Sequence, residues 1–317
     1  MSVLYEITHR TVYRYSEPVR FGEHRVLFRP RDSHDLHVLA TDLRTDPPAA
    51  ILLIQDPNSN SVALVQPLAP AARLEIISTF SIEHAHTNNL ELPVSDSARL
   101  FPLVYGVDDR LDLEPFLRPH HEDPQGVLTA WARQFVHSTG ASDTRDILVR
   151  MNRHIGDTLR YETRNEEGTQ EPLATLALGS GTCRDFSLLM MEAIRRLGIA
   201  ARFVSGYLYD ASLEGAGPAM VGSGSTHAWL QAYLPGAGWV PFDPTNNLLG
   251  GTQHIRVGVA RHPAQAAPVS GSWYGNKTAY LGMDVEVRVA RVDPAPKTAP
   301  ALERPVPSSA DAPDKTK

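Results

Sequence analysis

The sequence contains almost no cysteine, since Cys183 is the only thiol in 317 residues. A single cysteine cannot form an internal disulfide bond, so the fold must be stable without one, as is usual in a reducing compartment. No apolar run approaches the roughly 20 residues that a membrane-spanning helix needs. The first ten residues lack the basic segment and apolar stretch of a signal peptide. We therefore expect a cytoplasmic protein that does not associate with membranes.

Excess basic charge is also missing, because the net charge is −6 and the isoelectric point about 6.1. No basic stripe stands out, which argues against nucleic acid or an anionic membrane as a partner. The sequence has no G-x-x-x-x-G-K-[ST] phosphate loop, and neither G-S-G-T nor G-S-G-S matches the G-x-S-x-G of serine hydrolases. Its histidine pairs do not combine with cysteine or show the helical spacing of a zinc site. We expect no metal and no cofactor.

The first hundred residues do contain a series of strand patterns. Residues 3–15 alternate apolar and polar side chains with a period of two, which predicts a half-buried strand. Further strand-like runs follow, and D-P-N-S-N-S between two of them has the residues of a hairpin turn. No helical period interrupts these runs. We predict an N-terminal antiparallel β-sandwich over residues 1–95.

The pattern changes after this region. Residues 96–124 are dotted with proline and are predicted to be a linker. Helical spacing at 125–137 and 143–160, followed by a further helix and several strands, predicts an α+β domain over 125–292. Residues 293–317 are too poor in apolar side chains to order themselves, and we predict a disordered tail.

Cys183 stands where a glycine-rich turn precedes a helical pattern, in G-T-C-R-D-F-S-L-L-M-M-E-A-I-R-R-L-G. Thr182 is a suitable N-cap, and Asp185 three residues later can answer it in a variant of the capping box. Cys183 is then the first helical residue. The free N–H groups and partial positive charge at a helix N-terminus favour a thiolate and can bind an oxyanion. This position alone does not distinguish a nucleophile from a small buried core residue.

A thiolate nucleophile needs a base, and the base needs an orienting group. The segment T-H-A-W-L-Q-A-Y-L-P-G-A-G-W-V-P-F-D-P-T predicts a hairpin that offers both. If its loop is residues 235–237, His227 and Asp243 project from the same face, diagonally across the two strands and near enough to meet. A loop one residue longer or shorter would place them on opposite faces. On this pattern alone, His227 could still be a structural strand histidine, and Asp243 could simply cap the turn before Pro244.

Taken together, these motifs resemble the bacterial transglutaminase-like family of cysteine peptidases. The resemblance rests on G-T-C-R-D-F, G-I-A-A-R-F-V-S-G-Y-L, T-H-A-W and P-G-A-G-W-V-P-F-D-P-T-N. It extends to Y-E-I-T-H-R-T-V-Y-R-Y-S-E-P-V, which looks like the strand-rich region that precedes the catalytic domain in that family, and to H-I-R-V-G-V-A-R. One departure is R-H-P at residues 261–263, where the family pattern has an aspartate.

The resemblance implies a papain-like α+β catalytic domain in which Cys183 is the nucleophile, His227 the base and Asp243 the orienting carboxylate. It also implies that Tyr161, in L-R-Y-E-T, lies near the cleft, where substrate binding and simple packing are equally open roles. The implied reaction is acyl transfer from a peptide or isopeptide amide through a thioester, with hydrolysis favoured. Cross-linking to an amine and a non-catalytic binding module are the alternatives.

The resemblance further suggests a peptide or protein substrate and a partner in a peptide-ligase pathway, such as an ATP-grasp ligase. The sequence defines neither the substrate nor the oligomeric state.

Overall fold

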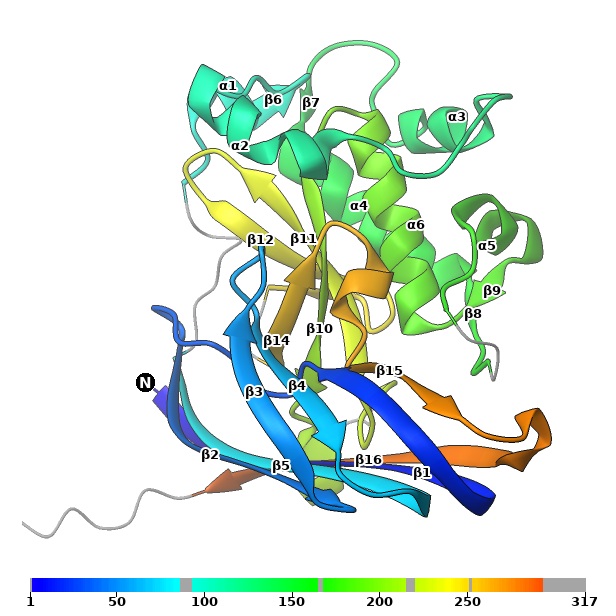
Figure 1. The fold of residues 1–317 in the computed structure, drawn as a ribbon. Helices are drawn as coiled ribbons and strands as arrows, with labels where there is room; N and C mark the ends of the chain where they lie inside the picture. The colour runs from blue at the N-terminus through cyan, green and yellow to red at the C-terminus, as the bar shows by residue number, and fades with distance from the viewer. Residues whose placement is uncertain (1, 86–92, 165–167, 215–219, 251–252, 293–317) are drawn as a thin grey trace, which may run out of the picture.

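A computed structural model describes most of the chain. It covers residues 2–85, 93–164, 168–214, 220–250 and 253–292. The predicted tail, residues 293–317, lies outside the described residues. No helix in the described stretches is long and apolar enough to cross a membrane. Figure 1 shows two antiparallel β structures, with the helices gathered around one of them.

The N-terminal strands form two antiparallel sheets that share the long strand β1. One sheet has the order β2-β5-β1-β16 and the other β3-β4-β1-β15. Apolar residues from both sheets meet in one buried cluster, which agrees with the predicted antiparallel β-sandwich and its hairpin between β3 and β4. The strands are β1 (Ser2–Val26), β2 (Leu36–Asp46), β3 (Ala49–Gln55), β4 (Ser61–Pro67), β5 (Ala71–Ala85), β15 (Val269–Tyr274) and β16 (Tyr280–Val292).

Two of these strands come from the C-terminal part of the chain. Strands β15 and β16 fall within residues 125–292, which the sequence assigns to the second domain, yet both hydrogen-bond to β1. The alternation of Val285, Val287 and Val289 predicts a strand, but a local pattern carries no information about a pairing partner near the other end of the chain. The proposed domain boundaries therefore stay a prediction.

The segment assigned to a linker, residues 96–124, is folded against the second unit. The hydroxyl of Tyr105 donates to the carbonyl of Tyr233 at 3.0 Å and accepts from the N–H of Ala200 at 2.9 Å. Its helical pattern is obscured in the sequence because Pro115 lies inside a helix. The elements of this segment are α1 (Asp96–Arg99), β6 (Leu100–Phe101) and α2 (Val107–Leu117).

The second unit is built on a five-stranded antiparallel sheet with the order β13-β12-β11-β10-β14. Helix α6 packs on β10 and β11, while α3, α4 and α5 contact its other sides (Figure 1). The helices are α3 (Val127–Arg133), α4 (Thr144–Thr158), α5 (Pro172–Leu178) and α6 (Cys183–Arg196). The sheet strands are β10 (Ala201–Leu208), β11 (His227–Leu234), β12 (Gly238–Asp243), β13 (Leu248–Leu249) and β14 (His254–Ala260). Short strands pair as β6 with β7 (Ser142–Asp143), and β8 (Arg160–Tyr161) with β9 (Ser180–Gly181).

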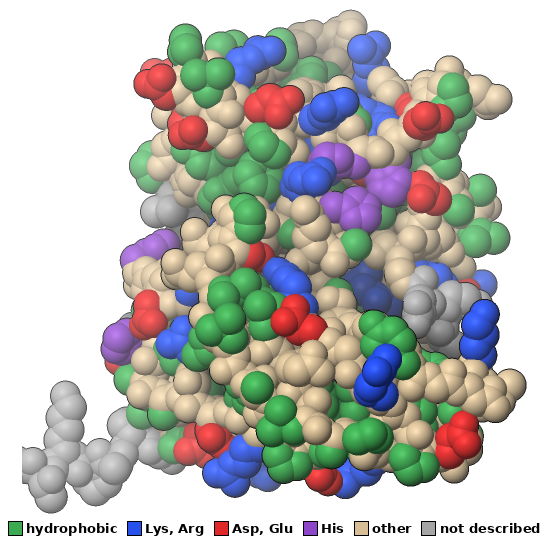
Figure 2. All heavy atoms as spheres, viewed as in Figure 1, with side chains coloured by type: hydrophobic (Ala, Val, Ile, Leu, Met, Phe, Trp, Pro, Cys, Tyr) green, Lys and Arg blue, Asp and Glu red, His purple; other side chains and the backbone are tan. Residues whose placement is uncertain are grey.

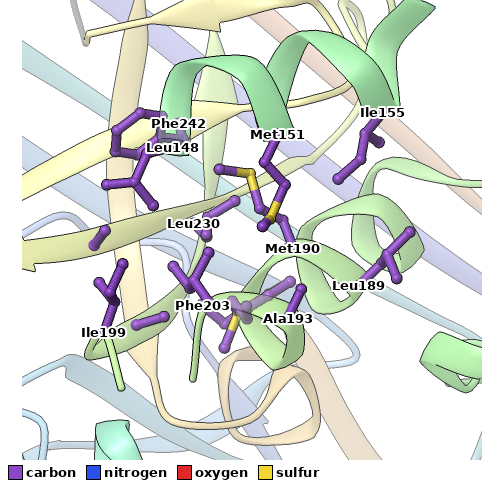
Figure 3. Packing of buried hydrophobic residues seen from close by; sticks show 14 of the residues in the cluster. Leu148, Met151, Ile155, Leu189, Met190, Ala193, Ile199, Phe203, Leu230 and Phe242 are labelled. Atoms are coloured by element: carbon purple, nitrogen blue, oxygen red, sulfur yellow. The ribbon is translucent and has the colours of Figure 1, made fainter. Parts of the chain in front are cut away.

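The apolar side of α6 packs into the largest buried cluster of the molecule. Figure 3 shows side chains from α6, from α4 and from the sheet meeting in this core. They include Leu189, Met190 and Ala193 of α6, Leu148, Met151 and Ile155 of α4, and Phe203, Leu230 and Phe242 of the sheet. This packing fixes the helix that begins at Cys183 against the hairpin that carries His227 and Asp243.

The polar side of α6 is buried as well, which the predicted apolar stripe does not indicate. The side chains of Glu192 and Arg195 are 0% exposed and form an ion pair of 2.9 Å. The Glu192 carboxylate also accepts the backbone N–H groups of His120 and His121. Since a buried charge must be paired and hydrogen-bonded, this network attaches the segment before α3 to the outer face of α6.

The N-terminal sheet supports the second sheet through β10 and β14. Tyr207 of β10 and Ile255 of β14 share an apolar cluster with Ile7 of β1. The side-chain amide of Asn60 donates to the carbonyl of Val259 at 2.8 Å and accepts its N–H at 2.9 Å. Strand β14 is therefore held by contacts from the N-terminal strands. On the face shown in Figure 2, basic and acidic side chains are interspersed instead of forming a patch of one sign.

Candidate active site

The N-terminus of α6 has the structure that the sequence predicts. Cys183 is the first helical residue, Thr182 is the N-cap, and Asp185 completes the capping box. The Asp185 carboxylate accepts the backbone N–H of Thr182 at 2.8 Å. This cap fixes the end of the helix whose first-turn N–H groups have no acceptor within the helix. The sulfur of Cys183 therefore lies at the positive end of the helix dipole.

Asp185 also receives a partner that sequence reasoning missed. Arg164 donates to both carboxylate oxygens, with Nε and Nη2 each at 3.0 Å, and the N–H of Gln170 donates at 2.7 Å. Burial alone would raise the pKa of Asp185, but the bonds from Arg164 and Thr182 hold it below its usual value. Gly181 makes room for this arrangement, because a Cβ there would lie 2.9 Å from the Cβ of Asp185. The ion pair spans 21 residues and has no local sequence signal.

The hairpin of β11 and β12 has the predicted register. Leu230 pairs with Phe242 and Leu234 with Gly238, so the loop is residues 235–237. His227 and Asp243 consequently project from the same face, and Nε2 of His227 lies 2.8 Å from Oδ2 of Asp243. Both side chains are fully buried. The structure therefore brings together the two hairpin residues that the sequence singles out.

The hydrogen bonds of Asp243 define which nitrogen of His227 faces it. An ionised carboxylate only accepts hydrogen bonds, so Nε2 of His227 carries a proton and donates it. The remaining nitrogen, Nδ1, is buried and makes no hydrogen bond of standard geometry. Cys183 nevertheless lies near enough to act on this imidazole through hydrogen bonding and charge. Nucleophile–base contacts are often long or poorly aligned until substrate is bound.

The charges of the pair follow from its surroundings. Burial by itself lowers the pKa of His227, but the Asp243 carboxylate and then Cys183 outweigh it and raise the pKa to about 10. Burial raises the pKa of Asp243, whereas the hydrogen bonds and charges of His227 and His254 lower it far below its ordinary value. At neutral pH the site therefore contains a carboxylate and an imidazolium.

A second histidine, His254, contacts the same carboxylate and was not predicted. Its Nε2 lies 3.1 Å from Oδ2 of Asp243, and the residue is 4% exposed. The motif H-I-R-V-G-V-A-R contains this residue, but its pattern indicates only a strand. Asn246 was also missed: its side-chain amide donates to Oδ2 of Asp243 at 3.1 Å.

His227, Asp243 and His254 are also the group, within the described part of the chain, whose ligand atoms lie close enough together to hold a metal ion. Their contacts have the lengths of hydrogen bonds, and Oδ2 of Asp243 already accepts three donors. A cation there would have to displace the Nε2 proton of each imidazole and would separate His227 from its carboxylate. We describe the group by its hydrogen bonds and assign it no metal.

Tyr161 lies near Cys183. Strand β8 pairs in parallel with β9 and places Tyr161 beside Gly181, two residues before Cys183. The tyrosine is half-buried, and burial together with the charge of Cys183 raises its pKa to about 12. Its hydroxyl is therefore protonated at neutral pH and able to donate a hydrogen bond. Its role stays a prediction.

A turn at residues 220–225 passes close to the base. The side chain of Asn246 holds it by accepting the N–H of Val221 at 2.9 Å and donating to its carbonyl at 3.1 Å. The next residue, Gly222, has a φ of 89°, and a Cβ there would lie 2.6 Å from Nδ1 of His227. Glycine thus keeps a side chain away from the nitrogen that faces Cys183.

Comparisons with known proteins agree with this geometry. The family model of the transglutaminase-like superfamily matches residues 129–244, and that of the bacterial transglutaminase-like N-terminal region matches residues 5–83. An uncharacterised protein of Mycobacterium tuberculosis is 30% identical over 300 residues, which are 90% of this chain and 92% of that protein. A protein-glutamine gamma-glutamyltransferase of Pseudomonas aeruginosa is 28% identical over 158 residues, which are 50% of this chain and 20% of that protein.

A solved structure shows the same fold. The protein comes from Cytophaga hutchinsonii, is described as a candidate cysteine protease, and matches with a TM-score of 0.68 at 20% identity. The match covers 93% of this chain and 92% of that one, so it includes the N-terminal sheets as well as the sheet that carries His227 and Asp243. With a relative 30% identical along nine-tenths of its length and both family models in the expected order, this chain belongs to the transglutaminase-like superfamily and begins with the bacterial N-terminal region of that family.

Proposed function

We propose that the protein catalyses acyl transfer from a peptide or isopeptide amide, through a thioester on Cys183, with water as the acceptor. The observation that carries the proposal is one buried cluster in which a cysteine at a helix N-terminus adjoins an imidazolium held by a carboxylate. Each part has a defined task in thiol catalysis. A non-catalytic binding module would not require these three groups to adjoin.

In the proposed reaction, the thiolate of Cys183 attacks the amide carbon and forms a tetrahedral oxyanion. The backbone N–H of Cys183 is one donor to that oxyanion. Nδ1 of His227 then gives its proton to the nitrogen of the leaving amine, the C–N bond breaks, and a thioester remains. His227 next takes a proton from water, which attacks the thioester and releases the acid and the thiolate. Asp243 stays ionised and keeps Nε2 of His227 protonated throughout.

We further propose that Tyr161 lines the substrate side of the site. Tyr161 is the second residue of β8, where it pairs with Gly181, and its protonated hydroxyl is close enough to Cys183 to feel the charge of the sulfur. From there it can donate a hydrogen bond to the acyl part of a substrate. A Tyr161→Phe variant tests this role, because loss of the hydroxyl should raise KM or lower kcat without changing the stability of the fold.

Transfer to an amine is the second candidate function. It is favoured by the match to a protein-glutamine gamma-glutamyltransferase over half of this chain. The two functions differ only in which nucleophile reaches the thioester. Incubation with a fluorescent amine and a glutamine-rich protein separates them: incorporation of the amine supports transfer, whereas steady release of ammonia or peptide without incorporation supports hydrolysis.

The reactivity of the thiol tests the proposal without knowledge of the substrate. Because Cys183 is the only cysteine, iodoacetamide reports on this one sulfur in the unmodified protein. We expect alkylation to stay fast as the pH falls below 8, and to show the profile of an ordinary thiol in His227→Ala. If the wild type already loses reactivity below pH 8 and His227→Ala has the same profile, the proposed function is wrong.

A further inference from the structure

Asp243 binds two imidazoles, and we propose that His254 is a positioning residue of this site, one that shares the Asp243 carboxylate with His227 and so limits how tightly the base is held. The inference rests on the proposed function. It assigns His254 no contact with substrate, and its effect passes through Asp243.

The two histidines converge on a single oxygen atom. Nε2 of His227 lies 2.8 Å and Nε2 of His254 lies 3.1 Å from Oδ2 of Asp243. The side chains of the histidines are 0% and 3% exposed. Because a carboxylate offers only acceptor sites, both Nε2 atoms donate to it. The two imidazoles therefore compete for the same negative charge.

The two histidines that meet at Asp243 come from strands that are not neighbours in the sheet. His254 begins β14, which is separated from β11 by β10. Gly206 of β10 lies in between, and a Cβ there would be 2.1 Å from the carbonyl oxygen of Ile255 and 2.8 Å from the ring of Trp229. The missing side chain lets the rings of Trp229 and His254 approach to 4.6 Å between centroids. The indole ring thus fixes the orientation in which His254 reaches Asp243.

Packing alone does not require a histidine at this position. The second nitrogen of His254, Nδ1, is buried and has no hydrogen-bond partner. An unsatisfied buried polar atom destabilises the folded state, and a phenylalanine would fill a similar volume without that penalty. What the imidazole provides in return is the hydrogen bond from its other nitrogen to Asp243.

This hydrogen bond should weaken the hold of Asp243 on the proton of His227. The titratable groups that face His227 are Cys183 on α6, Asp243 on β12 and His254 across the shared oxygen, while Tyr161 faces Cys183. Without the N–H of His254, the carboxylate charge would act more fully on His227. The imidazolium would then be a weaker acid, and protonation of the leaving amine would be slower.

Three variants test the inference. His254→Phe keeps the ring volume and removes the donor, whereas His254→Gln keeps an N–H donor near the position of Nε2. His24→Phe is the matched control, because His24 is also 4% exposed and hydrogen-bonded but lies in the N-terminal sheet. For each protein we would measure the alkylation rate of Cys183 against pH, the turnover of an amide substrate, and the unfolding midpoint.

We expect His254→Phe to move the upper inflection of the alkylation profile to higher pH and to slow turnover about 10–100-fold, by analogy with the loss seen when a hydrogen-bond partner of a metal-bound histidine is removed. His254→Gln should stay close to the wild type in both. His24→Phe should lose stability without moving the inflection. If His254→Phe does not fold, His254→Asn replaces it, since its shorter amide cannot reach Asp243.

The inference is overturned if the donor-free variant has the wild-type inflection, or if His254→Gln behaves like His254→Phe. These outcomes differ from failure of the proposed function. If the proposed function is wrong, His227→Ala leaves the pH profile of alkylation unchanged. If only the inference is wrong, His227→Ala changes that profile and substitutions of His254 do not.

Discussion

Among single side chains, the carboxylate of Asp243 accepts hydrogen bonds from five donor groups. Oδ2 accepts from His227, His254 and the amide of Asn246, and Oδ1 accepts from the backbone N–H groups of Thr245 and Asn246. Only a group with two accepting oxygens satisfies all of them. The ionised carboxylate is therefore required by the site and not merely tolerated.

This environment predicts a severe effect for Asp243→Asn. In either orientation, the asparagine amide turns its NH₂ group toward donors, so one side of the network loses its acceptor. We expect kcat to fall by about 10³–10⁴, comparable with the loss when a triad histidine loses its carboxylate. Turnover of an amide substrate measures this, with Cys183→Ala as the inactive reference. Near-normal turnover would mean that another carboxylate orients His227.

The raised pKa of His227 predicts how stability depends on pH. The folded value of about 10 lies above the ordinary value of 6.5, so protonation of His227 favours the folded state. That contribution is complete below about pH 6.5 and disappears as the pH rises through about 10. Urea unfolding across this range should show a loss of stability in the wild type that is absent from His227→Ala. Parallel curves for the two proteins would contradict the prediction.

Gly222 offers a test with a control in the same turn. Gly222 and Gly224 both have positive φ, 89° and 78°, but only at Gly222 would a Cβ collide with His227, at 2.6 Å from Nδ1. Gly222→Ala should therefore displace the imidazole and reduce kcat/KM by about 10²-fold, since a shift near 1 Å has this effect. Gly224→Ala carries the same backbone strain without the collision and should remain active. Equal activity of the two variants would show that the turn does not constrain the base.

Among the elements, helix α6 determines where Cys183 lies, and its N-terminus is anchored more firmly than a surface cap. The Asp185 side chain is 0% exposed and pairs with Arg164 as well as with the cap. The cap of α4 is different: Asp143 is exposed, and its side chain accepts the N–H of Asp146. The two helices therefore allow a comparison of a buried and an exposed anchor.

We expect Asp185→Ala to lower the free energy of unfolding by about 3–5 kcal/mol, because it removes a buried ion pair together with the carboxylate that caps α6. Asp143→Ala should cost only about 1 kcal/mol, the usual value for an N-cap. Urea denaturation of both variants gives the comparison. The lowered pKa of Asp185 also predicts how this stabilisation depends on pH. The ionised carboxylate stabilises the fold above its unfolded pKa of 3.8, and this stabilisation is lost as the pH falls below that value. Similar losses for the two variants would mean that the Arg164 pair adds nothing.

Elements with local signals could be predicted from the sequence, and those defined by distant contacts could not. The start of α6 follows from Thr182 and Asp185, and the register of the hairpin follows from its three-residue loop. By contrast, His254 reaches Asp243 only because β14 is placed beyond β10. The position of such a strand depends on the whole sheet. The ion pair between Arg164 and Asp185 could not be predicted either, because the two residues are brought together by the fold and not by a local pattern.

For the molecule as a whole, the central fact is that strands from both ends of the chain form one β structure. β1 pairs with β15 and β16, and the N-terminal sheet in turn packs on β10 and β14. In the sequence, the second unit therefore lies between the strands that support it. The alternating pattern of each strand could be read from the sequence, but their pairing across the chain could not.

This arrangement predicts that the C-terminal strands are needed for folding. A chain that ends after Ala260 lacks both β15 and β16 and leaves one edge of β1 unpaired along most of its length. We expect it to lose cooperative unfolding, whereas a chain that ends after Val292 keeps every strand that the structure describes and should unfold like the full protein. Circular dichroism during urea denaturation compares them. Cooperative unfolding of the shorter chain at the normal midpoint would contradict the prediction.

The pairing of Leu4 with Val292 also bears on synthesis at the ribosome. The nascent chain exposes β1 well before β16, so β16 becomes available to β1 only after α6 and the second sheet have been synthesised. Cys183 emerges before that point, as do His227 and Asp243. A prematurely terminated product therefore carries the thiol but lacks the last layer of its support, and only complete translation delivers a molecule in which all parts of the β framework are closed.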